Sequence, residues 1–331
     1  MGTERGGGAD GLALPAGRAR AGLVREIAAT GVWDRDAGWR AAFERVPRHL
    51  FVPYYFVGAP GGHERLWGED PDPARRERWL RGAYADQPLA TRLRDGELVS
   101  SSSQPSLMAK MLVDLEVRDG HRVLEIGAGT GYNAALLAHR LGDDAVTTVD
   151  LDPEITESAR AHLAAAGYRP AVVTRDGARG CAERAPFDRI MATCALRAVP
   201  VGWLGQCRRG ALILAPVATG LLKLEVRDAE FAQGRFLPTP AYFVAVRGEG
   251  SEPRGGAVSG VPRRVARDDV FRFLLDLSGG RVEASELLAW WEEAGRPGRE
   301  RFGVTVSGGR EWVWLDEPGR TCGWWEPVGG G

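Results

Sequence analysis

The chain has 331 residues and a formal net charge of −1. Its hydrophobic content of 44% and charged content of 26% are ordinary for a globular protein, and the small net charge creates no strong field toward nucleic acid or anionic lipid. We therefore expect no nucleic-acid partner and no membrane partner, and the lack of a sustained apolar segment near the N-terminus favours a cytoplasmic location.

The N-terminal quarter of the chain is expected to hold two short helices. Residues 1–18 are rich in glycine and predict a disordered N-terminus. Residues 20–33 place apolar side chains near helical spacing, and a second helix within 39–53 is halted by Pro47. Residues 57–78 are rich in glycine, proline and charge, which indicates a surface insertion.

From Pro105 onward, helical and strand-like segments alternate. Strands are expected at 121–127, 145–152, 171–177, 187–194 and 210–217, with helices at 106–115, 132–142 and 154–167. A late antiparallel pair is expected from 221–228 and 241–248. Strands that alternate with helices of about ten residues indicate right-handed crossovers. The pattern predicts a doubly wound, Rossmann-like α/β fold whose sheet is mostly parallel with an antiparallel edge.

The last quarter of the chain is expected to be a separate small α+β domain. Residues 249–263 have the composition of a linker, so the main domain is predicted at 19–248 and the small one at 264–331. The small domain is expected to contain two helices and two strands, and it holds six of the chain's 11 tryptophans: Trp290, Trp291, Trp312, Trp314, Trp324 and Trp325. We expect them to fill a small core, with an aromatic surface for a peptide as the alternative.

The stretch VLEIGAGTGYNAALL carries the strongest functional signal. Gly127, Gly129 and Gly131 follow an apolar strand and precede a helix, where glycine permits a tight turn close to a ligand. A dinucleotide fingerprint would need glycine at position 132, which is Tyr132, and no Gly-Lys-Ser/Thr follows to make a phosphate loop. Three alternate glycines with Glu125 before them are typical of S-adenosylmethionine-dependent methyltransferases. NAD binding and a simple solvated turn remain as alternatives.

Two carboxylates at the ends of the next strands extend this cofactor site. Asp150 lies about twenty residues past the glycines, where a carboxylate accepts hydrogen bonds from ribose hydroxyls. Asp176, with Gly177 beside it, follows the next strand and is placed to meet the adenine amino group. The sequence therefore predicts S-adenosyl-L-methionine as cofactor.

Five stretches in this order resemble the protein-L-isoaspartate (D-aspartate) O-methyltransferase family: VPRHLFVP, YADQPL, SSSQPSLMAKML, VLEIGAGTGYNAALLA and GRFLP. The resemblance covers about residues 20–247. It implies a carboxyl O-methyltransferase that acts on L-isoaspartyl or D-aspartyl residues of proteins or peptides, with S-adenosylmethionine as methyl donor.

The resemblance also assigns residues to the acceptor site. Residues 101–105 occupy the positions of the family's Thr-Ile-Ser-x-Pro motif, so the active-site hydroxyl maps to Ser103, and Ser101 stands in place of the threonine. Ser102 and Gln104 are expected to contact substrate. Capping of the following helix is an alternative role for these serines. Arg197 lies among small residues in a loop that is usually rich in alanine and proline, where it either pairs with a substrate carboxylate or points to solvent.

Methyl transfer to a carboxylate needs little further chemistry. A carboxylate is ionised at neutral pH and the methyl donor is already electrophilic, so neither a general base nor a metal is expected.

The leading function is repair of isoaspartyl residues. The first alternative is an aspartate O-methyltransferase that forms aspartimide in a constrained ribosomal peptide, as similar actinobacterial enzymes with C-terminal extensions do. The second is a non-catalytic peptide-binding module. We expect a monomer in each case.

Overall fold

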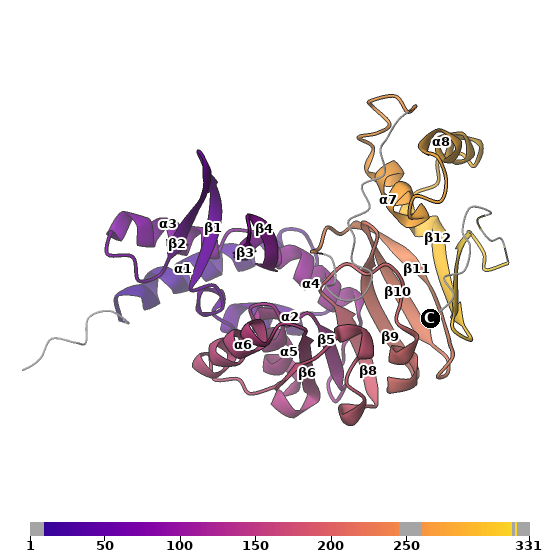
Figure 1. Cartoon of the computed structure of the whole chain (residues 1–331). Coiled ribbons are helices and arrows are strands. Elements are labelled where there is room, and N and C mark those ends of the chain that lie inside the picture. The colour runs from indigo at the N-terminus through magenta and orange to yellow at the C-terminus, as the bar shows by residue number, and fades with distance from the viewer. Residues whose placement is uncertain (1–9, 245–259, 320–321, 323–331) are drawn as a thin grey trace, which may run out of the picture. The chain divides into compact units, whose positions relative to one another are not determined.

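A computed structural model describes residues 10–244, 260–319 and 322 (Figure 1). The chain divides into two compact units, one made of Met1–Gly120 and Ala128–Thr174, the other of His121–Gly127 and Arg175–Gly331. Each unit contains helices together with strands. No helix in the described part of the chain is long and apolar enough to cross a membrane.

The first unit begins with helices α1 (Asp10–Ala28) and α2 (Gly38–Arg45). The helix starts at Asp10, so the prediction of disorder for 1–18 is wrong for 10–18, while residues 1–9 lie outside the described residues. Alanine, leucine and arginine favour a helix there. The buried Leu23 and Ile27 anchor it to the rest of the unit. As predicted, α2 ends before Pro47.

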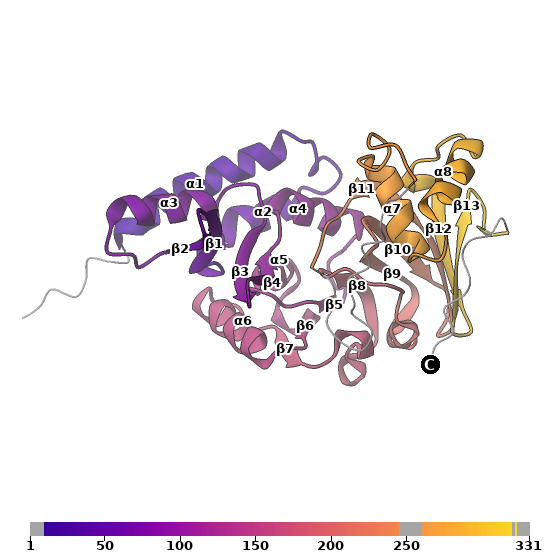
Figure 2. The ribbon, with the colours of Figure 1, turned by 45° about the horizontal axis from the view of Figure 1, so that its top comes forward.

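A four-stranded antiparallel sheet follows in the first unit, with the order β2–β1–β3–β4. Its strands are β1 (Tyr54–Ala59), β2 (Gly62–Trp67), β3 (Leu89–Arg94) and β4 (Glu97–Ser102). Helix α3 (Pro73–Ala83) lies beside β1 and β2 (Figure 2). Residues 57–78, predicted as a surface insertion, therefore hold most of a β-hairpin and the start of α3. Two of its glycines form the hairpin turn, where Gly61 has a φ of 82°.

The rest of the first unit follows the predicted alternation. It contains α4 (Pro105–Asp114), α5 (Tyr132–Leu141), β6 (Val146–Asp150), α6 (Pro153–Ala165) and β7 (Ala171–Thr174). Strands β6 and β7 are parallel, with Asp150 opposite Thr174. Apolar residues drive this arrangement, because α5 is buried from Tyr132 to Ala138 and β6 from Val146 to Val149.

In the second unit, seven strands are hydrogen-bonded in the order β13–β12–β11–β10–β9–β8–β5. They are β5 (Val123–Ile126), β8 (Phe187–Ala192), β9 (Cys207–Val217), β10 (Gly220–Val226), β11 (Phe231–Pro240), β12 (Phe302–Ser307) and β13 (Arg310–Leu315). Strands β5, β8 and β9 are parallel. From β9 to β13 every pair is antiparallel, so the antiparallel edge is longer than the sequence predicts.

The partner of β10 is β11, and the prediction of a strand at 241–248 is wrong. Residues 241–244 form no strand, and 245–248 lie outside the described residues. The sequence of β11 contains one glycine and two prolines, which are disfavoured in strands, so the pattern does not predict this strand. The glycine is required by close packing, because a Cβ added at Gly234 would lie 1.9 Å from the carbonyl oxygen of Lys223.

The C-terminal segment shares the core of the second unit. Strand β12 pairs with β11 from Phe231–Ser307 to Arg235–Gly303. Helices α7 (Asp269–Ser278) and α8 (Ala284–Glu293) lie next to β12 (Figures 1 and 2). The ring of Phe273 on α7 is 4.8 Å from that of Phe236 on β11.

The predicted boundary between 19–248 and 264–331 is therefore corrected, because apolar faces from both segments build one core. Trp291 and Trp314 are buried in it, as the prediction of core-filling tryptophans requires. Trp324, Trp325 and most of the predicted linker at 249–263 lie outside the described residues.

Short 3₁₀ turns complete the fold: η1 (Arg48–Leu50), η2 (Asp143–Ala145), η3 (Gly177–Arg179), η4 (Ala182–Arg184), η5 (Val201–Gln206) and η6 (Arg299–Arg301). Two of them, η1 and η3, contribute to the candidate site.

Candidate active site

The glycine-rich loop connects β5 to α5, and its residues 128–131, in the first unit, lie beside the end of β6. Ala128 donates a backbone hydrogen bond to Val149 in β6, at 3.0 Å. Gly131 is the residue before α5 and has a φ of 85°, and a Cβ there would lie 3.2 Å from the carbonyl oxygen of Ala159 in α6. Only glycine fits both the backbone conformation and the close approach to α6.

Asp150 is connected directly to this loop. Its Oδ2 accepts a hydrogen bond from the backbone N–H of Gly129 at 3.2 Å, and its Oδ1 accepts one from Asp152 at 3.3 Å. A carboxylate has about four acceptor sites, so these two bonds leave lone pairs for ligand hydroxyls. The structure thus brings Gly129 and Asp150 together at the end of β6, where the sequence predicts a ribose contact.

In the second unit, the first glycine of the motif is held by a residue that the sequence analysis missed. The hydroxyl of Thr193, just after β8, donates to the carbonyl oxygens of Gly127 at 2.8 Å and of Ile126 at 3.2 Å. A Cβ at Gly127 would lie 2.8 Å from the Thr193 hydroxyl. Glu125 lies on β5 with only 1% of its surface exposed.

Gly177 is the first residue of η3 in the second unit. Asp176 precedes this turn, and its Oδ1 accepts the N–H of Ala178 at 2.9 Å. The carbonyl oxygen of Gly177 accepts the indole N–H of the buried Trp203, also at 2.9 Å. Both bonds fix the backbone of the predicted adenine-binding turn.

The serine run belongs to a strand. Ser101 and Ser102 end β4, where they pair with Ala90 and Leu89 of β3, and Ser103 follows the strand. A Cβ added at Gly129 would lie 3.6 Å from the carbonyl oxygen of Ser101 and 4.0 Å from the hydroxyl of Ser100. The end of β4 therefore lies against the glycine-rich loop, and two motifs separated by some thirty residues meet within the first unit.

The residue before α4 is Gln104, whose side chain makes no capping bond, so the alternative prediction that the serines cap this helix is wrong. Asp86, in the YADQPL stretch, supplies the acceptor instead. One of its oxygens accepts the N–H of Ser106 at 2.8 Å and the other accepts the amide of Gln104 at 3.1 Å. A negative charge at a helix N-terminus is stabilised by the helix dipole.

Arg48 is the second functional residue that the sequence analysis missed. Its guanidinium is fully buried and donates to the carbonyl oxygens of Ala83 and Ala85, both at 3.0 Å. It also donates to the carbonyl oxygens of Gln87 and Ser103, both at 3.2 Å. Burial lowers the pKa of Arg48 to about 10, so the group remains charged at neutral pH. One cation thus connects VPRHLFVP, YADQPL and the serine strand.

Two other residues that are predicted to contact substrate, Ser102 and Arg197, lie in different environments. The hydroxyl of Ser102 is 3.4 Å from a guanidinium nitrogen of Arg48, and only 3% of this residue is exposed. Arg197 belongs to the second unit and is exposed. The first unit therefore contains all four acceptor-motif residues together with Gly129, Gly131 and Asp150. Glu125, Gly127, Asp176, Gly177 and Arg197 belong to the second.

The family model described as protein-L-isoaspartate(D-aspartate) O-methyltransferase matches residues 74–235. The protein-L-isoaspartate O-methyltransferase of Methanoculleus marisnigri is 36% identical over 220 residues, which cover 65% of this chain and 86% of the relative. That of Methylorubrum populi is 34% identical, with 71% of this chain and 98% of the relative covered.

Solved structures show the same fold. A protein-L-isoaspartate O-methyltransferase matches with a TM-score of 0.62 at 22% identity, covering 90% of this chain and all of the other. A protein described as such an enzyme from Plasmodium falciparum, solved with S-adenosyl-L-homocysteine, matches with a TM-score of 0.51 at 14% identity. It covers 68% of this chain and 97% of the other. The predicted methyltransferase fold is confirmed.

Proposed function

Because the chain belongs to the protein-L-isoaspartate (D-aspartate) O-methyltransferase family, we propose that it methylates the carboxylate of L-isoaspartyl or D-aspartyl residues in proteins or peptides. The methyl donor is S-adenosyl-L-methionine. The observation that carries the proposal is the contact between the end of β4 and the glycine-rich loop, where Gly129 approaches the Ser101 carbonyl. It places acceptor-motif serines beside the cofactor motif.

The residues present fit this cofactor. Gly129 lies against the end of β4 with a φ of 50°, which favours glycine, and Asp150 has acceptor capacity beyond its two backbone bonds. We assign cofactor binding to Glu125, Gly127, Gly129, Gly131, Asp150, Asp176 and Gly177. When bound, S-adenosylmethionine supplies a methyl group that is already electrophilic.

The acceptor carboxylate requires orientation more than activation. It is ionised at neutral pH, since its ordinary pKa is about 4, and a donor hydroxyl holds it in line with the methyl group. We assign this role to Ser103 and, beside it, Ser101. The Ser103 carbonyl is fixed by Arg48, which leaves the hydroxyl as the group available to substrate.

The sequence also predicts substrate contacts for Ser102, Gln104 and Arg197, and their surroundings in the structure differ. The buried Ser102 hydroxyl faces Arg48, which favours a positioning role over direct substrate contact. The Gln104 amide donates to Asp86 and Ser106, so its carbonyl oxygen remains as an acceptor for a peptide N–H. Arg197 is exposed and is the cation of the TCALRAVP loop, and we assign it to a substrate carboxylate. A monomer acting in the cytoplasm stays our prediction.

The test is methyl transfer from labelled S-adenosylmethionine to three peptides that differ only in one residue: L-isoaspartate, D-aspartate or L-aspartate. We expect base-labile labelling of the isoaspartyl peptide at the highest kcat/KM. A constrained cyclic peptide with L-aspartate is tested alongside them, and labelling of that peptide alone would instead support aspartimide formation. Cofactor binding without transfer to any peptide would support a non-catalytic peptide-binding module.

A further inference from the structure

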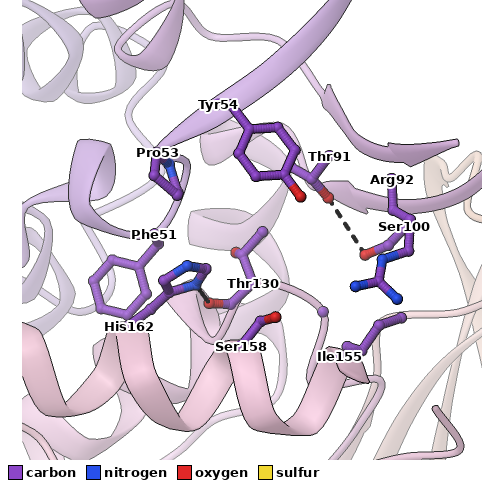
Figure 3. A pocket seen from close by; sticks show the side chains of 11 residues that line it. Phe51, Pro53, Tyr54, Thr91, Arg92, Ser100, Thr130, Ile155, Ser158 and His162 are labelled. Atoms are coloured by element: carbon purple, nitrogen blue, oxygen red, sulfur yellow. Dashed lines mark hydrogen bonds between the residues drawn. The ribbon is translucent and has the colours of Figure 1, made fainter. Parts of the chain in front are cut away.

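The first unit contains a pocket beside the serine strand (Figure 3). Four parts of the unit line it: residues 51–54, strands β3 and β4, the glycine-rich loop, and helix α6. Its enclosed space is about 60 Å³, and the volume rises to about 420 Å³ when the part open to solvent is counted. The space suits one side chain better than a large cofactor.

The walls of the pocket combine apolar side chains with polar ones. Figure 3 shows the ring of Tyr54 and the side chain of Ile155 on opposite sides of the space, with Phe51 and His162 at one end. The rings of Phe51 and His162 are 6.5 Å apart in an edge-to-face arrangement. Aromatic walls of this kind favour a flat ring, because edge-to-face and offset contacts add to the burial of apolar area.

The polar groups of the pocket offer acceptors. Ser158 donates its hydroxyl proton to the carbonyl oxygen of Glu154 at 2.7 Å, so its oxygen remains an acceptor. Nδ1 of His162 is 3.0 Å from the carbonyl oxygen of Thr130, a contact that requires the proton on Nδ1. Burial lowers the pKa of His162, so its Nε2 is an acceptor at neutral pH. An occupant with a donor at its tip would satisfy these groups.

The pocket has no uncompensated charge. Arg92, the cation in its lining, is 2.6 Å from Glu154 and 3.7 Å from Asp152. His162 is neutral at physiological pH for the reason given above. An anionic or cationic occupant would therefore lose solvation without gaining a partner, and an uncharged one is favoured.

The location of the pocket connects it to the acceptor site. Ser100 and Gly129 both line it, Ser100 precedes Ser101, and Gly129 is the residue whose Cβ position approaches the Ser101 carbonyl. Ser103 is three residues from Ser100, which corresponds to about 10 Å of extended chain. A peptide whose acceptor residue lies at Ser103 can reach the pocket with a neighbouring side chain.

We propose that this pocket binds an aromatic side chain with a donor tip, tyrosine best, located one to three residues from the acceptor residue of the substrate peptide. The inference rests on the proposed function, because it requires a peptide acceptor at Ser103. It adds a preference for sequence around the methylated residue.

The experiment uses the full chain and isoaspartyl peptides in which one tyrosine is scanned through positions −3 to +3 in an alanine background. We expect one position to raise kcat/KM at least tenfold over the all-alanine peptide, through a lower KM, and lysine at that position to give no gain. Ser158→Trp fills the pocket and should abolish the preference for tyrosine. Glu157→Trp is the matched control, since the neighbouring side chain is 75% exposed, and should retain the preference.

The outcomes separate the inference from the proposed function. Transfer to all peptides at equal kcat/KM overturns the inference alone. A tyrosine preference that survives in Ser158→Trp overturns the assignment to this pocket, and Ser158→Leu repeats the test if the tryptophan variant does not melt cooperatively. No transfer to any isoaspartyl peptide overturns the proposed function and the inference with it.

Discussion

The buried guanidinium of Arg48 donates a hydrogen bond to the carbonyl oxygen of Ser103, 55 residues later in the chain, at 3.2 Å. Two other bonds, to Ala83 and Ala85, tie the same group to the turn that contains Asp86. The carboxylate of Asp86 in turn holds the first turn of α4. Ser103, which we assign to the acceptor carboxylate, is thus positioned by two charged side chains of the first unit. Arg48 binds its carbonyl oxygen, and Asp86 holds the helix that follows it.

Arg48→Lys should lower both stability and methyl transfer. Lysine keeps the charge but has three donors on one atom, so it cannot reach carbonyls that the guanidinium bonds from two nitrogens. We expect a loss of about 2–4 kcal/mol in the free energy of unfolding, because buried carbonyls lose their donors. Urea unfolding and single-turnover kinetics check this. Normal values in both would show that Arg48 does not position the serine strand.

Ser103→Ala should lower the methyl-transfer rate by roughly ten- to a hundredfold, about 1.4–2.7 kcal/mol, with S-adenosylmethionine affinity near that of the wild type. The reason is the loss of one charge-assisted hydrogen bond to the acceptor carboxylate. Single-turnover methylation and calorimetric titration measure the two quantities. Ser103→Thr keeps the hydroxyl and should recover most of the rate. A normal rate in Ser103→Ala would remove Ser103 from catalysis.

Asp150→Ala should weaken cofactor binding by roughly 2–4 kcal/mol. The variant loses the ribose acceptor and also the bond that holds the Gly129 N–H. Calorimetric titration with S-adenosylmethionine measures the effect, and Asp144→Ala, at an exposed position beyond α5, is the control. Equal affinity in wild type and Asp150→Ala would exclude this carboxylate from the cofactor site.

Glu311 should make stability depend on pH. Burial raises its pKa from 4.5 to about 7, although the backbone N–H of Val199 donates to Oε2 at 2.8 Å. The folded state binds the proton more tightly than the unfolded state. The free energy of unfolding therefore falls as the pH rises from about 4.5 to 7, by up to about 3 kcal/mol from this group.

Glu311→Gln should remove this decrease and stabilise the protein at pH 8. Urea unfolding at pH 5 and pH 8 checks the prediction, with Glu317→Gln at an exposed position as control. If the two variants have the same pH dependence, Glu311 is ionised in the folded state and the prediction is wrong.

Truncation after Gly248 should destabilise the second unit or make it insoluble. It removes β12, the hydrogen-bonded neighbour of β11, and the ring of Phe273 that packs on Phe236. An exposed β11 edge would favour aggregation. Solubility and melting temperature of the truncated chain are the measurements. A soluble fragment that melts like the full chain would restore the predicted separate domain.

Local signals were sufficient for the central part of the fold. The apolar strand before Gly127 and the alternation up to β10 follow from hydrophobic periodicity, which depends only on neighbouring residues. Strand β11 was not predicted, because Gly234 and the nearby prolines are typical of a loop. Close packing against β10 nevertheless requires the glycine.

The positioning residues of the site could not be predicted by the same means. Arg48 acts through carbonyl groups 35 to 55 residues away, and backbone carbonyls have no sequence signature. Asp86 caps a helix that begins some twenty residues later, whereas capping rules consider adjacent residues. Thr193, just after β8, bonds to Gly127 across 66 residues of sequence. Each of these contacts is produced by the tertiary fold.

The pairing of β11 with β12 has a consequence for biosynthesis. Phe231 lies opposite Ser307, so β11 has no neighbour on that side until 76 further residues have left the ribosome. At an elongation rate of roughly 5–20 residues per second, the strand remains an open edge for about 4–15 s. We expect nascent chains arrested before residue 302 to recruit chaperones, and chains released past residue 315 to escape them.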